Sequence, residues 1–279
     1  MDIIERTIES YKRFLEIKKP EHFKQYLIRE KHNMEAARSE AIIFALLRQM
    51  TENVTVNENL STGGVDLLCK GAGYNFFVET TSIGIKATAK RSGLNNIIDR
   101  ETHAQAFSLI TQTLRNRLSD KTTQLAKQDA ARILFLTSEH IFGDVLLGVG
   151  AARELFTGDI NIAFKINSTE SESLLETKLG NAAFFRLNSQ GKIELCRTSI
   201  SAVILCSINY DKCNLVGLIN PKPKYQFPIR IFPQVPFIRL SSWPPKENNL
   251  EMEWVIHEPI ADSIYHKPKI LTNTELKEY

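Results

Sequence analysis

Two short apolar segments joined by a small flexible stretch most strongly constrain how the first third of this chain folds. Residues 65–69 and 76–80 are rich in Val, Leu and Phe, and Lys70-Gly71-Ala72-Gly73 between them is typical of a turn. The pattern predicts a β-hairpin. If its turn centres between Ala72 and Gly73, Asp66 and Glu79 face each other with Cβ atoms about 4.5–5.5 Å apart. Carboxylates that close repel unless they share a cation, and Mg²⁺ prefers such oxygen ligands.

Composition places the chain among ordinary globular proteins. Its 279 residues are 43% hydrophobic and 24% charged, and no apolar run approaches the roughly 20 residues that a membrane-spanning helix needs. The first residues lack the basic start and long apolar core of a signal peptide. The four cysteines show no Cys-x-x-Cys spacing, which favours reduced thiols. We expect a cytoplasmic protein without a membrane segment.

Hydrophobic periodicity predicts an α/β architecture. Residues 3–16 and 20–50 have helical periodicity, with Pro20 at a helix start. Asp99–Gln128 predicts an amphipathic helix, or two, and the continuous apolar run Ile133–Leu136 predicts a central strand covered on both faces. A further helix is expected near Asp144–Leu155. The order predicts a mixed sheet flanked by helices.

The second half of the chain predicts further strands and then a different kind of segment. The expected strands, which could extend the sheet, are Asn161–Ile166, Ala182–Leu187, Lys192–Cys196, Ser201–Ile208 and Leu215–Ile219. Nine of the ten prolines follow residue 220. We therefore divide the chain into a core with N-terminal helices, residues 1–220, and a Pro-rich, mostly extended C-terminal segment packed on it, residues 221–279.

Two groups of residues have both a structural and a nucleic-acid interpretation. Between Gly84 and Arg132 there are nine Lys or Arg against four acids, an excess that suits either a solvated helix face or contact with phosphates. In the C-terminal segment, aromatic and basic residues alternate between Lys222 and Trp243. They are interpreted first as aromatics that fix the segment to the core, and second as a nucleic-acid surface.

The residues around the hairpin resemble the PD-(D/E)xK nuclease superfamily, the fold of many restriction endonucleases. In that superfamily a helix with a glutamate precedes a hairpin carrying Asp and then Glu-x-Lys, and a helix and a strand follow. Here Ser39-Glu40 lies on a predicted helix, Gly64-Val65-Asp66 and Val78-Glu79-Thr80-Thr81 form the hairpin, and the predicted 101–128 helix and Ile133–Leu136 strand follow. The resemblance covers roughly residues 35–140.

The resemblance implies a fold, a cofactor and a reaction. The fold would be a restriction-endonuclease-like mixed sheet flanked by helices. Asp66 and Glu79 would bind Mg²⁺ or Mn²⁺, with a backbone carbonyl near Thr80 as a further ligand and Glu40 acting through a water or a second ion. The metal would activate the water that attacks a DNA phosphodiester and neutralise the charge of the transition state.

The sequence departs from the superfamily pattern at Thr81, which occupies the usual lysine position. A threonine supplies no positive charge. In the superfamily this lysine is sometimes found on the following helix, so Lys121 is the favoured substitute, with Gln124 on the same helix face, and Lys86 is the second candidate. A lysine at either position would orient the attacking water or stabilise the phosphate.

Several functional hypotheses stay open at this stage. The first is a metal-dependent DNA endonuclease of the kind that restriction or defence systems use, which would cut both strands as a homodimer. The second is a degenerate nuclease-fold protein that acts as a DNA-binding or protein-interaction module, and the third is an RNA or small-molecule hydrolase. The sequence has neither a phosphate-binding Gly-x-x-x-x-Gly-Lys-Ser/Thr loop nor a Gly-x-Gly-x-x-Gly dinucleotide fingerprint, and His103 and His140 have no spacing that indicates a triad.

Overall fold

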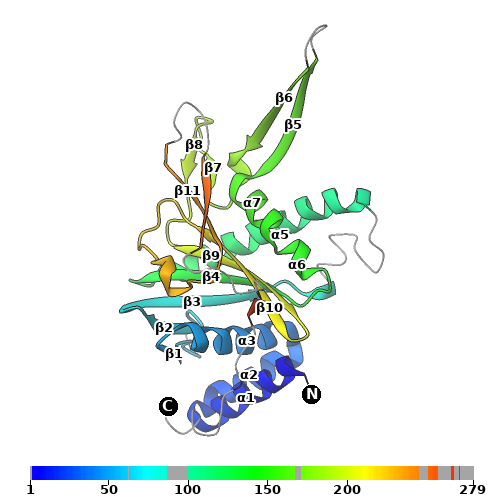
Figure 1. Ribbon diagram of the computed structural model, residues 1–279. Coiled ribbons are helices and arrows are strands. Elements are labelled where there is room, and N and C mark those ends of the chain that lie inside the picture. The colour runs from blue at the N-terminus through cyan, green and yellow to red at the C-terminus, as the bar shows by residue number, and fades with distance from the viewer. Residues whose placement is uncertain are drawn as a thin grey trace.

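The computed structural model describes residues 2–61, 63–86, 100–166, 171–244, 251–256, 265–266 and 270. A mixed β-sheet forms the middle layer, and helices cover both of its faces, as Figure 1 shows. The helices are α1 (Ile3–Lys18), α2 (Pro20–His32), α3 (Met34–Met50), α5 (Arg100–Leu125), α6 (Gly143–Leu146) and α7 (Val149–Thr157). The predicted α/β class is confirmed. No helix in the described ranges combines the length and the apolar character needed to cross a membrane.

The main sheet has nine strands in the described part of the chain. Eight follow the order β1-β2-β3-β4-β9-β10-β11-β12, and β13 pairs with β10. Their bounds are β1 (Asn53–Val56), β2 (Leu67–Gly71), β3 (Tyr74–Ser82), β4 (Ala131–Ser138), β9 (Ala202–Asn209), β10 (Lys212–Ile219), β11 (Phe237–Leu240), β12 (Met252–Val255) and β13 (Tyr265–His266). Strand β4 pairs in parallel with β3 and β9, and all of its residues are buried. This confirms the central strand predicted from the apolar run at 133–136.

The predicted hairpin is present, with a shorter turn than the sequence suggested. Strands β2 and β3 pair from Leu67 with Val78 to Gly71 with Tyr74, so only Ala72 and Gly73 form the turn. Their φ angles of 48° and 78° are both positive, as a two-residue type I′ turn requires. The turn centre between Ala72 and Gly73 matches the prediction. Because Leu67 pairs with Val78, the residues next in the register, Asp66 and Glu79, lie opposite each other.

Two long predicted helices are each divided in the structure. The expected 20–50 helix breaks at Asn33, whose side-chain Oδ1 accepts the Ala36 N–H at 3.2 Å and caps α3. An asparagine side chain competes with the helix for backbone hydrogen bonds, which explains the break. The expected helix at 144–155 is likewise divided into α6 and α7, and Gly148 lies at the N-terminal end of α7.

Three of the expected strands do not extend the main sheet. Strands β5 (Asp159–Ile166) and β6 (Ser171–Lys178) form one separate two-stranded sheet, and β7 (Phe185–Leu187) and β8 (Ile193–Leu195) form another. The edge of β10 is instead occupied by β11 and β13, both from the C-terminal segment. That segment was expected to be mostly extended loop, and its described part contains three strands.

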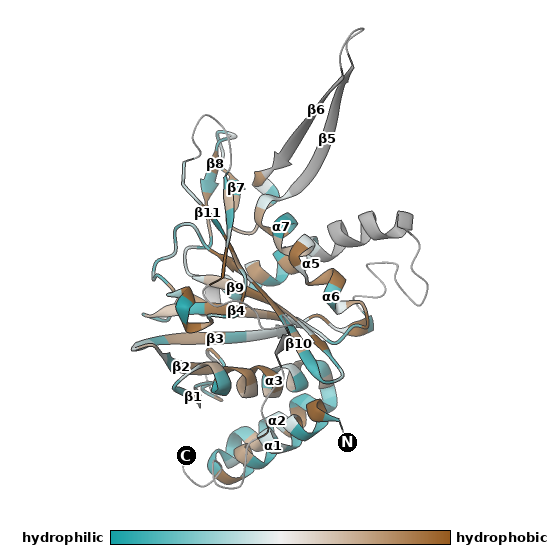
Figure 2. Cartoon of the chain, viewed as in Figure 1, coloured by the Kyte–Doolittle hydropathy of each residue, from teal (hydrophilic) through white to brown (hydrophobic). Residues whose placement is uncertain are grey.

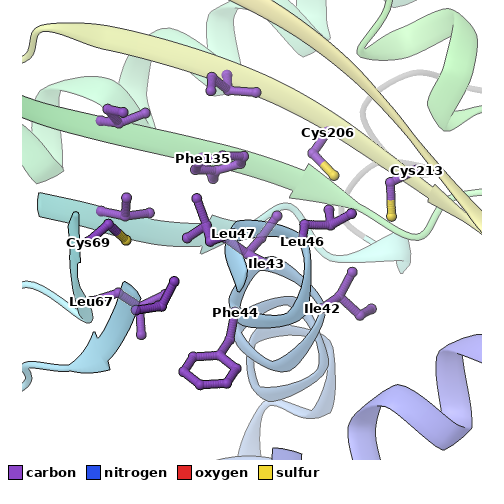
Figure 3. Packing of buried hydrophobic residues seen from close by; sticks show 14 of the residues in the cluster. Ile42, Ile43, Phe44, Leu46, Leu47, Leu67, Cys69, Phe135, Cys206 and Cys213 are labelled. Atoms are coloured by element: carbon purple, nitrogen blue, oxygen red, sulfur yellow. The ribbon is translucent and has the colours of Figure 1, made fainter. Parts of the chain in front are cut away.

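Two hydrophobic clusters hold the layers together. One lies between the sheet and α1–α3, and Figure 3 shows Ile43 and Leu47 of α3 pointing toward Phe135 of β4. The other lies between the opposite face and α5–α7. Figure 2 shows hydrophobic residues concentrated along the central strands and α3. Phe227, Phe232 and Phe237 are buried in the first cluster, which favours the structural interpretation of these aromatics over a nucleic-acid surface.

Candidate functional site

The carboxylates predicted on the hairpin lie next to each other and are linked through the backbone. The Thr80 N–H donates to Asp66 Oδ2 at 2.7 Å, and the Asp66 backbone N–H donates to the Glu79 carboxylate. Glu79 is 2% exposed on β3. The hairpin register therefore sets both side chains at the same place: Glu79 is buried on β3, and Asp66, one residue before β2, is half-buried.

Lys121 on α5 reaches this pair. Its Nζ lies 2.5 Å from Glu79 Oε1, although 42 residues separate the two in the chain. Thr81 follows Glu79 by two residues and so lies on the same face of β3; it is 9% exposed, and its Oγ1 has no hydrogen-bond partner among the described residues. Lys86 is exposed, and no described contact links it to the site. The side chain of Gln124 lies outside the described residues.

Glu40 of α3 approaches the same site with partners that the sequence did not predict. Tyr11 OH donates to Glu40 Oε1 at 2.8 Å, and Arg29 Nη1 contacts Glu40 Oε2. The other nitrogen of this fork, Nη2, lies 2.8 Å from Glu58 Oε2 in the β1–β2 loop. In one straight helix Arg29 and Glu40 would lie about 16 Å apart along the axis, so the break at Asn33 brings them together.

Burial and like charges raise the pKa values of all three predicted carboxylates. Burial raises the pKa of Asp66 well above its ordinary value, and the Glu79 and Glu40 charges raise it further against the Thr80 hydrogen bond. The pKa of Glu79 is raised mainly by burial, which Lys121 opposes. Burial raises the pKa of Glu40 as well, and Arg29 is the main opposing influence. These groups therefore form one electrostatically coupled cluster.

The cluster offers the oxygen ligands that a hard cation such as Mg²⁺ prefers, but its side chains do not supply a complete coordination shell. In the described ranges, no group of three or more acidic, histidine or cysteine side chains is arranged to hold a metal by itself. Asp66 has no ion-pair partner among the described residues, whereas Glu40 and Glu79 each have a cationic one. Mg²⁺ is commonly held by only one or two carboxylates together with water and substrate phosphate. Asp66, Glu79 and the Thr80 carbonyl fit that pattern.

His140 takes no part in this site. It is buried, and its Nδ1 accepts the Phe142 N–H at 3.2 Å, a local contact that closes the loop after β4. The side chain of His103 lies outside the described residues. Sequence reasoning missed Tyr11, Arg29 and Glu58; Asn33, a good helix cap, was the one available signal, because it predicts the break that places Arg29.

Comparisons with models of known protein families, with curated proteins and with solved structures found no significant match. They assign no family to the chain.

The raised pKa of Asp66 gives a stability prediction. A carboxyl whose pKa is higher in the folded protein binds more protons when folded, so stability falls as pH rises from the unfolded pKa, about 3.9, through the folded value. Asp66→Asn removes this loss. In EDTA at about pH 8 the variant should melt at a higher temperature than the wild type, and the difference should vanish near about pH 4.

A bound divalent metal should reverse the difference in melting temperature between the wild type and Asp66→Asn. A ligand that binds only the folded state at 100 times its Kd stabilises by about 2.7 kcal/mol. If Asp66 and Glu79 hold a metal, as the resemblance implies, millimolar Mg²⁺ or Mn²⁺ should raise the melting temperature of the wild type and leave Asp66→Asn unchanged. A variant that melts below the wild type in EDTA at about pH 8 would contradict the electrostatic interpretation of the cluster.

Proposed function

We propose that this protein is a divalent-metal-dependent nuclease with a restriction-endonuclease-like core that hydrolyses DNA phosphodiester bonds. The observation that carries the proposal is the ion pair between Lys121 and Glu79 beside Asp66. It supplies from α5 the positive charge that Thr81 cannot supply. The element order α3, β2–β3 hairpin, α5, β4, with β3 and β4 parallel, also agrees with the order that the resemblance implies.

Each residue has a defined task in this proposal. Asp66, Glu79 and the Thr80 carbonyl would hold Mg²⁺ or Mn²⁺, which when bound polarises the phosphate and lowers the pKa of the attacking water. Lys121 orients that water or stabilises negative charge on the phosphate. Glu40 accepts hydrogen bonds from Tyr11 and Arg29, and these hold its carboxylate at the edge of the cluster. The basic excess between residues 84 and 132 favours DNA as the polyanion, and a homodimer would cut both strands.

One observation favours the second candidate function, a catalytically degenerate nuclease-fold protein that binds DNA or another protein. Glu40 and Glu79 each pair with a cationic side chain, Arg29 and Lys121, so two of the three carboxylates are partly compensated without a metal. Such a module would bind DNA without cleaving it and would be indifferent to divalent ions.

A cleavage assay distinguishes these two functions. The purified chain should convert supercoiled plasmid to nicked or linear DNA with Mg²⁺ or Mn²⁺ and not with EDTA. Asp66→Asn and Glu79→Gln should reduce the rate by about 10³-fold, corresponding to several kcal/mol of lost transition-state stabilisation. Equal cleavage by wild type and both variants would indicate a contaminant. DNA binding without cleavage under all these conditions would support the degenerate module.

A further inference from the structure

A second polar site lies beside α5, separate from the carboxylates. A cavity of about 390 Å³ that opens to solvent is lined by α5, the turn at 180–182, β7 and Arg197, and none of these lining residues belongs to the carboxylate site. Gln112 lines it nine residues before Lys121, which is two and a half helical turns and therefore the opposite face of α5. Figure 1 shows α5 and the β7–β8 hairpin on the same side of the sheet.

The lining of this cavity is basic and polar. Among the described residues, three arginines and three side-chain amides line it and no acidic residue does: Arg115, Arg186, Arg197, Gln112, Asn116 and Asn181. Guanidinium groups are the side chains best matched to phosphate, and amides supply both donors and acceptors to an uncharged polar group. The cavity therefore has the chemistry of an anion site.

Arg197 is fixed over the cavity by neutral groups. Its Nη1 donates to the Ala183 carbonyl at 2.5 Å, and its Nη2 donates to Ser119 Oγ on α5 at 2.7 Å. The φ angle of Arg197 is 51°, a conformation that non-glycine residues rarely adopt. No carboxylate contacts this guanidinium in the described part of the chain. The fold therefore holds a positive charge here without a neutralising partner.

The other two arginines are held from outside the cavity. Arg186 donates from Nε to Glu194 across the β7–β8 hairpin at 2.6 Å, and its two terminal nitrogens have no hydrogen-bond partner in the described part of the chain. Arg115 donates to the Thr111 carbonyl and hydroxyl at 3.2 Å, and that hydroxyl donates to Glu154 at 2.7 Å. Glu194 and Glu154 orient these arginines without lining the cavity.

We propose that this cavity binds a phosphate group carried by a nucleotide-sized ligand. The arginines receive the phosphate, and the amides of Gln112, Asn116 and Asn181 contact the attached polar part. The volume lies within the range of small-molecule sites, about 300–1,000 Å³. The phosphate belongs either to a free nucleotide or to a nucleic-acid backbone. The inference does not depend on the nuclease proposal, because the two sites share no residue.

Calorimetric titration of the full chain in EDTA with inorganic phosphate, AMP, ATP and a single-stranded 12-mer oligonucleotide tests this proposal. Saturable 1:1 binding of AMP or ATP would identify a free nucleotide, and binding of the oligonucleotide alone would identify a backbone phosphate. Arg186→Gln should weaken the observed binding about ten- to a hundredfold, since hydrogen bonds to charged groups are worth about 1.5–3 kcal/mol.

Arg239→Gln is the matched control. Arg239 pairs with Glu253 at 2.7 Å across the exposed β11–β12 hairpin, just as Arg186 pairs with Glu194, but it does not line the cavity. The Arg239→Gln variant should bind the phosphate probes as tightly as the wild type does. No saturable binding of any probe, or equal losses in the two variants, would overturn the proposal. Asp66→Asn should bind these probes as the wild type does. Failure of the nuclease proposal can therefore be told apart from failure of this phosphate-site proposal.

Discussion

Lys121→Met should lower the rate of metal-dependent DNA cleavage by about 10²–10³-fold, the usual cost of removing one preorganised donor from an active site. Lys121 is the one described lysine that contacts Glu79, at 2.5 Å. Its loss also removes the ion-pair partner of a carboxylate that is 2% exposed, so a decrease in stability is expected as well. Thermal unfolding must therefore be measured together with cleavage.

A second-site substitution separates the chemical effect of Lys121 from its structural one. Thr81 lies two residues after Glu79 on the same face of β3, and its buried hydroxyl has no hydrogen-bond partner within the described ranges. In Thr81→Lys/Lys121→Met, the lysine is returned to the position that the superfamily pattern uses. We expect the double variant to recover at least about tenfold of the lost rate. Lys127→Met, at an exposed position just beyond α5, is the control and should cleave like the wild type.

Two outcomes would contradict this assignment of the lysine. Full activity in Lys121→Met would show that the cation next to Glu79 has no catalytic task. A double variant that melts like the wild type and cleaves no better than Lys121→Met would show that a lysine at position 81 cannot replace Lys121. The first result would leave Lys86 as the remaining sequence candidate.

Phe76→Ala should cost about 3–5 kcal/mol of unfolding free energy, the usual range for removing a buried phenylalanine. Phe76 on β3 is 0% exposed, and its ring packs edge-on against Phe227 and Phe232 at centroid distances of 5.5 and 5.9 Å. The contact joins the middle of the sheet to the Pro-rich segment. Urea denaturation of the purified variant measures the loss.

Tyr74→Ala is the matched control for Phe76→Ala. Tyr74 lies on the same face of β3, two residues earlier, but it is 47% exposed, and its described ring contact is with the guanidinium of Arg230 at 5.7 Å. An exposed cation–π contact contributes about 0.5–1 kcal/mol, so this variant should lose no more than about 1 kcal/mol. If the two variants lost similar amounts, Phe227 and Phe232 would not be part of the same core as β3.

Local features of the chain predicted local features of the fold. The hairpin and the facing positions of Asp66 and Glu79 follow from strand periodicity and from one small turn, interactions between residues close in sequence. The buried strand β4 follows from an uninterrupted apolar run. The predicted strands at 161–166 and 182–196 did not join the main sheet, and β11 and β13 pair with β10 instead. Competition for a sheet edge is not encoded in any single segment.

The sequence by itself indicated the pair of carboxylates, since a two-residue period and a turn centred between Ala72 and Gly73 set Asp66 opposite Glu79. The tertiary structure decided which cations reach them. Lys121 contacts Glu79 because α5 packs over the sheet, and Arg29 contacts Glu40 because the helix breaks at Asn33. Both contacts depend on the angle at which helices pack. That angle is set by side-chain packing across the whole core, so the resemblance proposed Lys121 as one of two candidates, Asn33 signalled the helix break but not the Arg29 contact, and nothing in the sequence indicated Glu58.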